Sequence, residues 1–422
     1  MPSTPSSRPD PIASLRHAGF LTYLVGSLLS NTGNQMRAVA VGWEVVERTG
    51  QAIYLGYVGL VLALPVIVLA LPAGAAADRW SRKSIIMIAQ AGLALSGCGL
   101  AWASVTHASL GWLYFFLLGT GVFRALGWPA STAIVVSLVP YKVFPNAAMW
   151  RSVGFQLAAT LGPLVGGLLL AWWDPAIVYL LDAASSLVLM ACMGFIRPRA
   201  HERTAEPHSW SSFLQGVRFL RRHPLILSTM VLDMVAVLFG GVTALLPIFA
   251  RDILHVGAVG FGWLRAMPSI GAISMSLLLA TLPPMRRSGP MLLGAVTVFG
   301  LATIVFAVSK SFPLSLAMLF VLGAADNISV VIRATVLQLL TPDSMRGRVT
   351  AVSVIFIGTS NEIGEFESGV AAQWLGIVPS VVFGGAMTLV TVAGVARTWP
   401  QLIRMGPLEE LAPPETADQV AG

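Results

Sequence analysis

The stretch that decides the fold is Gly74-Ala-Ala-Ala-Asp78-Arg79-Trp80-Ser81-Arg82-Lys83. It places one carboxylate and three cations within six residues, directly between two long apolar runs. In a soluble protein such a cluster would be an ordinary solvated turn. Between two runs that are each long enough to cross a bilayer, it is expected to form a tight cytoplasmic loop at the membrane surface.

The composition of the whole chain points the same way. Of the 422 residues, 56% are hydrophobic and 11% are charged, and the mean hydropathy is +0.78. Soluble domains carry about 25% charged residues, so most of this surface cannot face water. Apolar runs recur along the chain, which indicates a polytopic helical membrane protein. The alternating segments of roughly ten residues that a membrane β-barrel needs are absent from the sequence.

Several function classes are not expected. The formal net charge is +7, but the basic residues cluster in short loops between apolar runs, so nucleic acid is not an expected partner. Cys98 and Cys192 each lie inside an apolar run, which indicates buried small side chains rather than a disulfide or a metal pair. No catalytic triad, zinc-protease motif or ATP-binding loop stands out. We therefore expect neither an enzyme nor a primary pump, and no metal or cofactor.

The apolar runs give twelve candidate membrane spans, six on each side of a polar linker. Several exceed the roughly 20 residues needed to cross a bilayer, so tilted helices are expected. The predicted spans are 20–46, 52–77, 84–105, 110–138, 144–172, 175–196, 224–250, 257–282, 291–308, 313–340, 349–374 and 377–397.

The distribution of Lys and Arg predicts the orientation. With the N-terminus inside, eighteen of the 26 cations fall in cytoplasmic segments, three fall in outer loops and five fall within spans. The positive-inside rule therefore predicts that both termini and the linker are cytoplasmic.

The chain is predicted to be an all-α membrane protein of two pseudo-symmetric six-helix bundles. The linker carries apolar residues at 210, 213, 214, 217 and 220, one helical stripe beside arginines, which predicts an amphipathic helix at the membrane interface. The predicted units are a disordered cytoplasmic tail 1–16, an N-terminal bundle 17–196, a cytoplasmic linker 197–223, a C-terminal bundle 224–398 and a cytoplasmic tail 399–422.

Two short echoes support an internal repeat. Gly59-x5-Pro65 matches Gly262-x5-Pro268 after 203 residues, and Phe116-Leu-Leu-Gly119 matches Phe320-Val-Leu-Gly323 after 204 residues. The shared offset of about half the chain is typical of transporters built from repeats.

Ionisable residues within the spans are candidate functional groups, because each costs about 2.5–3.5 kcal/mol at mid-helix on insertion scales. Burial raises the pKa of a carboxyl group and a nearby arginine lowers it, so helix motion can switch protonation. The alternative is a structural charge pair that holds helices together. Glu44, Asp182 and Glu367 are expected towards a span end or interface. The candidate proton and substrate cavity comprises Asn34, Arg37, Arg124, Asp233, Asp326, Arg333, Glu362 and Glu365, with Asp326 and Glu362 as the first candidate proton carriers, followed by Asp233 and Glu365.

Pairs seven residues apart, Arg37 with Glu44 and Asp326 with Arg333, lie about 10 Å apart along a helix axis. Each of these four side chains is therefore expected to look across a cavity to another helix.

The loop Gly74-x3-Asp78-Arg79-x-x-Arg82-Lys83 resembles the loop signature of the major facilitator superfamily, with Ser81 where glycine is usual. The second-half counterpart, Pro284-Met-Arg-Arg287, keeps the cations and lacks the acid.

The segment Gly154-x7-Gly162-Pro163-x-x-Gly166-Gly167 is similar to the antiporter signature of exporter branches, with Ala158 in place of one glycine. Arg124 resembles the membrane arginine of those branches, although Gly127 stands one residue early. Thr341-Pro-Asp-Ser-Met-Arg346-Gly-Arg348-Val349 resembles a segment of the enterobactin-exporter-like family.

The resemblance implies a secondary transporter that exports a small organic molecule, siderophore-like or drug-like, by proton antiport and alternating access. It implies a monomer with both termini cytoplasmic in a bacterial inner membrane, whose partners are its substrate, protons and lipid. The cavity is expected between the first, fourth, seventh and tenth spans, with the fifth and eleventh beside it. An importer or facilitator, and a non-transporting sensor or scaffold, remain alternatives.

The opening loop then has two interpretations. Asp78 can cap the eleventh span and pair with Arg346 or Arg348, closing a cytoplasmic gate together with Gly74. Alternatively, Arg79, Arg82 and Lys83 only retain the loop inside, which does not explain Asp78.

Overall fold

The structure is a computed structural model that describes residues 10–197, 210–283 and 285–410; for a few of these, Asp78 and Trp210 among them, only the backbone is described. Every element in these ranges is helical. The first half holds η1 (Ala13–Arg16), α1 (Ala18–Thr49), α2 (Ala52–Arg79), α3 (Arg82–Val105), α4 (Leu110–Leu138), η2 (Tyr141–Val143), α5 (Phe144–Trp172) and α6 (Pro175–Phe195). The second half holds α7 (Trp210–Arg222), α8 (Pro224–Phe239), α9 (Val242–Ile248), η3 (Phe249–Ile253), α10 (Gly257–Thr281), α11 (Ser288–Val308), α12 (Phe312–Leu340), α13 (Asp343–Leu375), α14 (Ile377–Thr398), α15 (Pro400–Ile403) and η4 (Leu408–Glu410).

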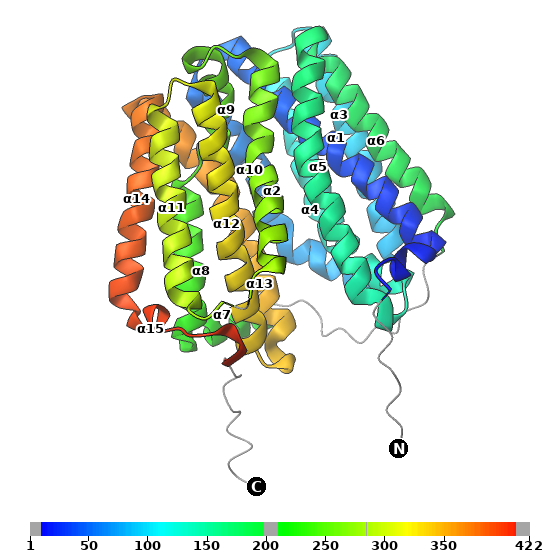
Figure 1. The fold of residues 1–422 in the computed structure, drawn as a ribbon. Helices are drawn as coiled ribbons and strands as arrows, with labels where there is room; N and C mark the ends of the chain where they lie inside the picture. Colours follow the sequence, from blue (N-terminus) through cyan, green and yellow to red (C-terminus); the bar gives the residue numbers. More distant parts are fainter. Residues whose placement is uncertain (1–9, 198–209, 284, 411–422) are drawn as a thin grey trace.

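Ten helical segments in the described ranges are long and apolar enough to cross a membrane. Two further helices, α1 with 32 residues and α13 with 33 residues, are at least as long but carry the charged side chains discussed below. They run alongside the ten in the same bundles (Figure 1). The arrangement is consistent with the predicted twelve spans.

The seventh predicted span, 224–250, is discontinuous. It divides into α8, a break at Gly240-Gly241, α9 and the π-helical turn η3. The break packs closely on other helices, since a Cβ added at Gly384 of α14 would lie 2.0 Å from the carbonyl oxygen of Phe239. Paired glycines have the conformational freedom that such a break needs.

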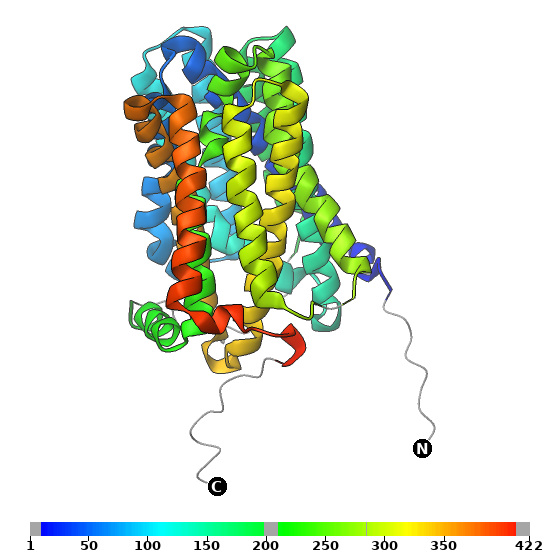
Figure 2. The same ribbon diagram turned by 60° about the vertical axis from the view of Figure 1, so that its left-hand side comes forward.

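The helices form two bundles, with η1, α7, α15 and η4 at one end of the molecule, which we call the terminal side (Figures 1 and 2). In the first bundle α1 packs on α5 and α6, α3 on α4 and α6, and α2 on α4. In the second, α10 and α11 pack on α12, α11 on α14, and α8 on α13 and α14. The bundles meet along two seams, α2 with α13 and α5 with α10.

The glycines of the first sequence echo occupy equivalent places in the two seams. A Cβ at Gly59 would lie 3.1 Å from the carbonyl oxygen of Glu362 on α13, and a Cβ at Gly262 would lie 2.6 Å from that of Pro163 on α5. Small residues let the helix backbones approach this closely. The predicted repeat therefore coincides with the contacts that join the bundles.

The bundles share one hydrophobic core on the side away from the termini and have separate cores on the terminal side. The shared core includes Val46 and Phe261, and Trp43 stacks on Phe261 with ring centroids 6.2 Å apart. Arg251 Nη1 also donates to the carbonyl oxygen of Val46 at 2.5 Å. On the terminal side, Ile134 belongs to a core of the first bundle and Ile332 to a core of the second. Within the described residues, the hydrophobic cores of the two bundles therefore merge only on the side away from the termini.

The predicted amphipathic helix is present as α7, but protein covers part of its apolar stripe. Val217 and Leu220 pack into the terminal-side core of the second bundle, because α7 lies against α13 and α8. Leu214 remains 56% exposed.

The predicted disordered tail 1–16 needs a correction for the part that the structure describes. Ser14 is fully buried, and its amide and hydroxyl groups donate to Asn146 Oδ1 at 3.0 and 2.6 Å. The side chain of Trp150 donates to the carbonyl oxygen of Pro11 at 3.0 Å. These hydrogen bonds dock η1 and its flanking residues onto α5. Residues 1–9 lie outside the described ranges.

Candidate functional site

A cavity of about 400 Å³ lies on the inner face of the second bundle. Four of the spans expected around the cavity line it: the fifth, seventh, tenth and eleventh. The eighth and ninth spans also contribute lining residues, whereas the first and fourth, which were expected, contribute none. The break between α8 and α9 forms part of its wall. Its polar side chains are Gln156, Thr243, Ser269, Asp326, Asn327, Asn361 and Glu365.

Arg124 and Glu362 join the two bundles across this region. Arg124 on α4 forms an ion pair with Glu362 Oε1 on α13, and the two side chains are 32% and 15% exposed. The second oxygen, Oε2, is buried without a hydrogen-bond partner in the described structure. The site therefore contains a charge pair whose partners belong to different halves.

Asp326 and Glu365 differ from Glu362. Both line the cavity, and neither side chain makes a hydrogen bond or an ion pair within the residues that the structure describes. The nearby guanidinium group of Arg265 is engaged elsewhere, since its Nη1 donates to the carbonyl oxygen of Thr243 at 3.1 Å. Two carboxyl groups thus face the cavity without a bonded partner.

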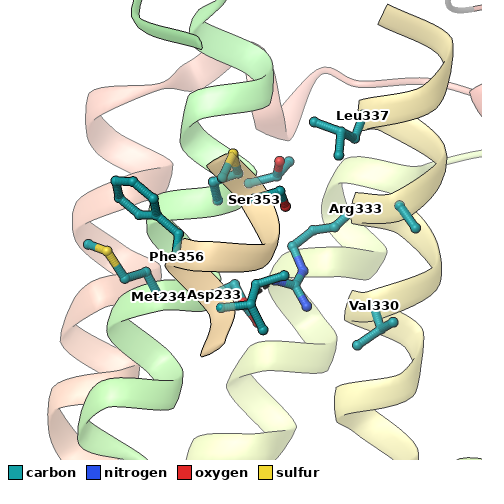
Figure 3. A pocket seen from close by; sticks show the side chains of 11 residues that line it. Asp233, Met234, Val330, Arg333, Leu337, Ser353 and Phe356 are labelled. Carbon is teal, nitrogen blue, oxygen red and sulfur yellow. Dashed lines mark ion pairs between the residues drawn. The ribbon is translucent and has the colours of Figure 1, made fainter. Parts of the chain in front are cut away.

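Asp233 and Arg333 form a separate ion pair inside the second bundle. Figure 3 shows Arg333 extending from α12 towards Asp233 on α8, in a pocket of about 140 Å³ with apolar walls that include Met234 and Phe356. The two side chains are only 6% and 11% exposed. Two of the four candidate proton carriers, Asp233 and Glu362, are therefore paired with arginines, and Asp326 and Glu365 are not.

Arg37 and Asp182 form a third pair, inside the first bundle. Arg37 Nη1 donates to Asp182 Oδ2 at 2.5 Å, and Asn34 also accepts a hydrogen bond from Arg37. The side chains are 6% and 1% exposed. The expectation that Arg37 faces a cavity is wrong, because α1 and α6 pack directly and bury Arg37 together with Asp182.

Glu44 is likewise buried within the first bundle. It pairs with Arg48, one helical turn further along α1, and accepts a hydrogen bond from the hydroxyl group of Tyr179 at 2.6 Å. It does not reach the cavity.

The glycines of the antiporter-like segment on α5 serve two different contacts. A Cβ at Gly162 would lie 2.9 Å from the carbonyl oxygen of Thr32 on α1, and one at Gly166 would lie 3.1 Å from the Cα of Met36. A Cβ at Gly167 would lie 2.6 Å from the carbonyl oxygen of Ala258 on α10. Gly154 has only ordinary contacts. The segment thus holds α5 against α1 within its bundle and against α10 across the seam.

Two cations of the opening loop bind backbone carbonyl groups of their own bundle. Arg82 Nη1 donates to Ala133 at 3.1 Å, and Lys83 donates to Gly194 and Ile196 at 2.9 and 2.8 Å, at the end of α6. The Asp78 side chain lies outside the described structure. Its pairing with Arg346 or Arg348 therefore stays a prediction.

The sequence reasoning missed part of the site. Gln156, Asn327 and Asn361 line the cavity, although polar side chains inside long apolar runs are a signal that could have found them. The Gly240-Gly241 pair could have located the break in the seventh span. Among the described residues no group of three or more His, Cys, Asp or Glu side chains is placed to hold a metal ion.

Comparison with solved structures places the fold. The nucleoside transporter NupG has a TM-score of 0.69 at 14% identity, covering 90% of this chain and 99% of that chain. A bacterial homolog of the human lysosomal transporter Spinster, in an inward-facing and unoccupied conformation, has a TM-score of 0.69 at 18% identity, covering 94% and 99%.

Comparison of sequences identifies the family. The enterobactin exporters EntS of Shigella boydii serotype 18 and Escherichia coli O1:K1 are each 28% identical over 326 residues, which is 76% of this chain and 75% of theirs. A family model described as transmembrane secretion effector matches residues 9–417. The chain therefore belongs to the transmembrane secretion effector family, within the major facilitator superfamily of multi-pass membrane transporters.

Proposed function

We propose that the protein exports a small organic molecule, siderophore-like or drug-like, from the cytoplasm in exchange for protons. The observation that carries the proposal is the cavity lined by the unpaired Asp326 and Glu365, next to the Arg124–Glu362 pair that links the bundles. The similarity to enterobactin exporters supports export and a siderophore-like substrate.

The proton-binding role falls on Asp326 and Glu365. An ionised carboxylate in a low-dielectric site is costly unless it is paired, so an unpaired carboxyl group binds a proton readily, whereas one beside a guanidinium group stays ionised. Entry of substrate into the cavity changes the surroundings of both groups and promotes proton release. Asp233, held by Arg333, has a structural role in this scheme.

The Arg124–Glu362 pair couples the cavity to the motion of the bundles. Its two partners move apart whenever the halves rock, so it must break and re-form in each cycle. If both termini are cytoplasmic, as the cation distribution predicts, the separate cores on the terminal side correspond to an inward-facing state.

Vesicle transport tests the proposal. The substrate is first sought by comparing metabolites in the medium of cells with and without the protein. Its movement is then followed in everted vesicles with an imposed pH gradient, and uptake is expected to stop when the gradient is collapsed. Transport that continues unchanged contradicts proton coupling, and movement only in the opposite direction contradicts export.

A further inference from the structure

The cations on the terminal side of the two halves have different surroundings. In the first half, Arg82 and Lys83 bind backbone carbonyl groups and Arg16 pairs with Asp10 at 2.8 Å. Only Lys142 and Arg197 among the described first-half cations on this side are exposed with no side-chain hydrogen bond or ion pair. In the second half, seven arginines are exposed, and their side chains make no hydrogen bond or ion pair in the described part of the chain. They form a set that we call the arginine rim: Arg218, Arg221, Arg222, Arg286, Arg287, Arg397 and Arg404.

The arginine rim lies at the ends of membrane-crossing helices. Arg221 and Arg222 directly precede the span that begins at Pro224, and Arg286 and Arg287 directly precede Ser288 of α11. Arg397 is in the last turn of α14, and α15 lies between it and Arg404. Long basic side chains at such positions reach the phosphate layer of the bilayer.

The elements that carry the rim adjoin one another. α8 contacts α7, α14 and α15, and α11 contacts α14 and α15. Figure 2 shows α7, the end of α14 and α15 at the same end of the molecule. The rim is therefore carried by one connected group of elements at the terminal side of the second bundle.

α7 holds its arginines outwards in a fixed orientation. Its apolar side is buried, and a Cβ at Gly216 would lie 2.9 Å from the carbonyl oxygen of Arg348 on α13, so the two helices are in close contact. Arg218, Arg221 and Arg222 project from the opposite side, next to the exposed Leu214. This surface combines three cations with one apolar side chain.

Guanidinium groups bind phosphate oxygens in bidentate geometry, and clusters of basic residues beside membrane helices recognise anionic lipids. We propose that the arginine rim binds the phosphodiester headgroups of anionic phospholipids in the leaflet on the terminal side. Retention of loops inside the cell requires only positive charge. It does not require three arginines fixed on a docked helix. The inference does not depend on what the protein transports.

The experiment uses the purified full-length chain in detergent, with dioleoyl phosphatidylglycerol and dioleoyl phosphatidylcholine as chain-matched probes. Bound lipid is counted by native mass spectrometry, and the melting temperature is recorded with each lipid. The wild-type protein is expected to retain phosphatidylglycerol in preference to phosphatidylcholine and to melt at a higher temperature with it. Equal retention of the two lipids by the wild-type protein overturns the proposal, and this comparison requires no variant.

Variants then locate the site. The triple change Arg218→Gln, Arg221→Gln and Arg222→Gln is expected to weaken phosphatidylglycerol binding at least about tenfold. The matched control removes two exposed cations of the first half, Lys142→Gln and Arg197→Gln, and is expected to bind as the wild type does. Wild-type retention by the triple variant, or displacement of the lipid by inorganic phosphate alone, contradicts the assignment.

Discussion

The protein places buried charge pairs in two different settings. Arg37–Asp182 lies inside the first bundle, with side chains 6% and 1% exposed, and a rocking motion of the halves does not separate its partners. Arg124–Glu362 lies between the bundles and is more exposed, with side chains 32% and 15% exposed, although each pair leaves one carboxylate oxygen without a hydrogen-bond partner in the described structure. The comparison supports the proposal that a pair within one bundle stabilises the fold, whereas the pair between bundles takes part in the transport cycle.

The largest expected effect is on stability, from Asp182→Asn. This change leaves Arg37 as a buried charge without its counter-ion, and breaking a buried pair costs about 3–5 kcal/mol. Unfolding of the purified protein in detergent should therefore begin at much lower denaturant concentration, while transport per folded molecule stays near the wild-type value. A variant as stable as the wild type would contradict the structural role assigned to the pair.

The next effect is on transport, from Glu362→Gln. Arg124 then loses its partner in the other bundle, and the transport rate is expected to fall about 100-fold, the scale of losing one partner of a buried pair. Stability should change less than in Asp182→Asn, because the pair joins the bundles rather than holding one together. Glu409→Gln changes an exposed acid and is the control. Transport at the wild-type rate would show that the pair between bundles has no part in the cycle.

A smaller effect is expected from Gly167→Val in the seam. The added side chain meets Ala258 and Gly262 on α10, so the bundles cannot close on the side away from the termini, and transport should fall about tenfold. Gly294→Val is the matched control, because a Cβ there meets no atom within 4 Å. Cross-linking between α5 and α10 reports the closure directly, and equal yields in both variants would contradict the account of the seam.

The smallest effect is expected from Asp78→Asn. Arg82 and Lys83 already bind their own bundle, so loop retention does not require this acid, and membrane insertion should be unchanged. Loss of the proposed gate contact should slow transport by a few-fold. This corresponds to about 1 kcal/mol, the contribution of a single charge interaction at a protein surface. Transport by the Asp78→Asn variant at the wild-type rate would contradict the gate hypothesis.

The sequence predicted the helical membrane fold and the repeat because both depend on local pattern. The structure places Gly59 and Gly262 of the first echo at equivalent positions in the two seams. The second echo aligned the two halves with an error of two residues on α4. Gly323 on α12 lies against Pro268 on α10, and the glycine on α4 that lies against Pro65 on α2 is Gly121 rather than Gly119. Short apolar matches fix the period of a repeat better than its register.

The charged site was less predictable. The sequence identified most of its ionisable residues, because acids and arginines inside apolar runs are conspicuous. It could not predict which acid pairs with which arginine. Asp233 pairs with Arg333 because α8 packs against α12, and the sequence does not specify that packing. The rotation of each helix about its axis is set by the tertiary packing, which composition and spacing do not specify.

The most direct measurement follows the distance between the bundles as a function of pH. Spin labels are placed at Tyr141→Cys in the first half and Ile403→Cys in the second, both exposed on the terminal side, with Cys98 and Cys192 replaced by serine. The account predicts that acidification shifts the distance distribution, and that the shift disappears in the Asp326→Asn, Glu365→Gln variant. A pH-independent distance in the otherwise wild-type chain, or the same shift in both proteins, would contradict the claim that proton binding by these two carboxyl groups is coupled to the motion of the bundles.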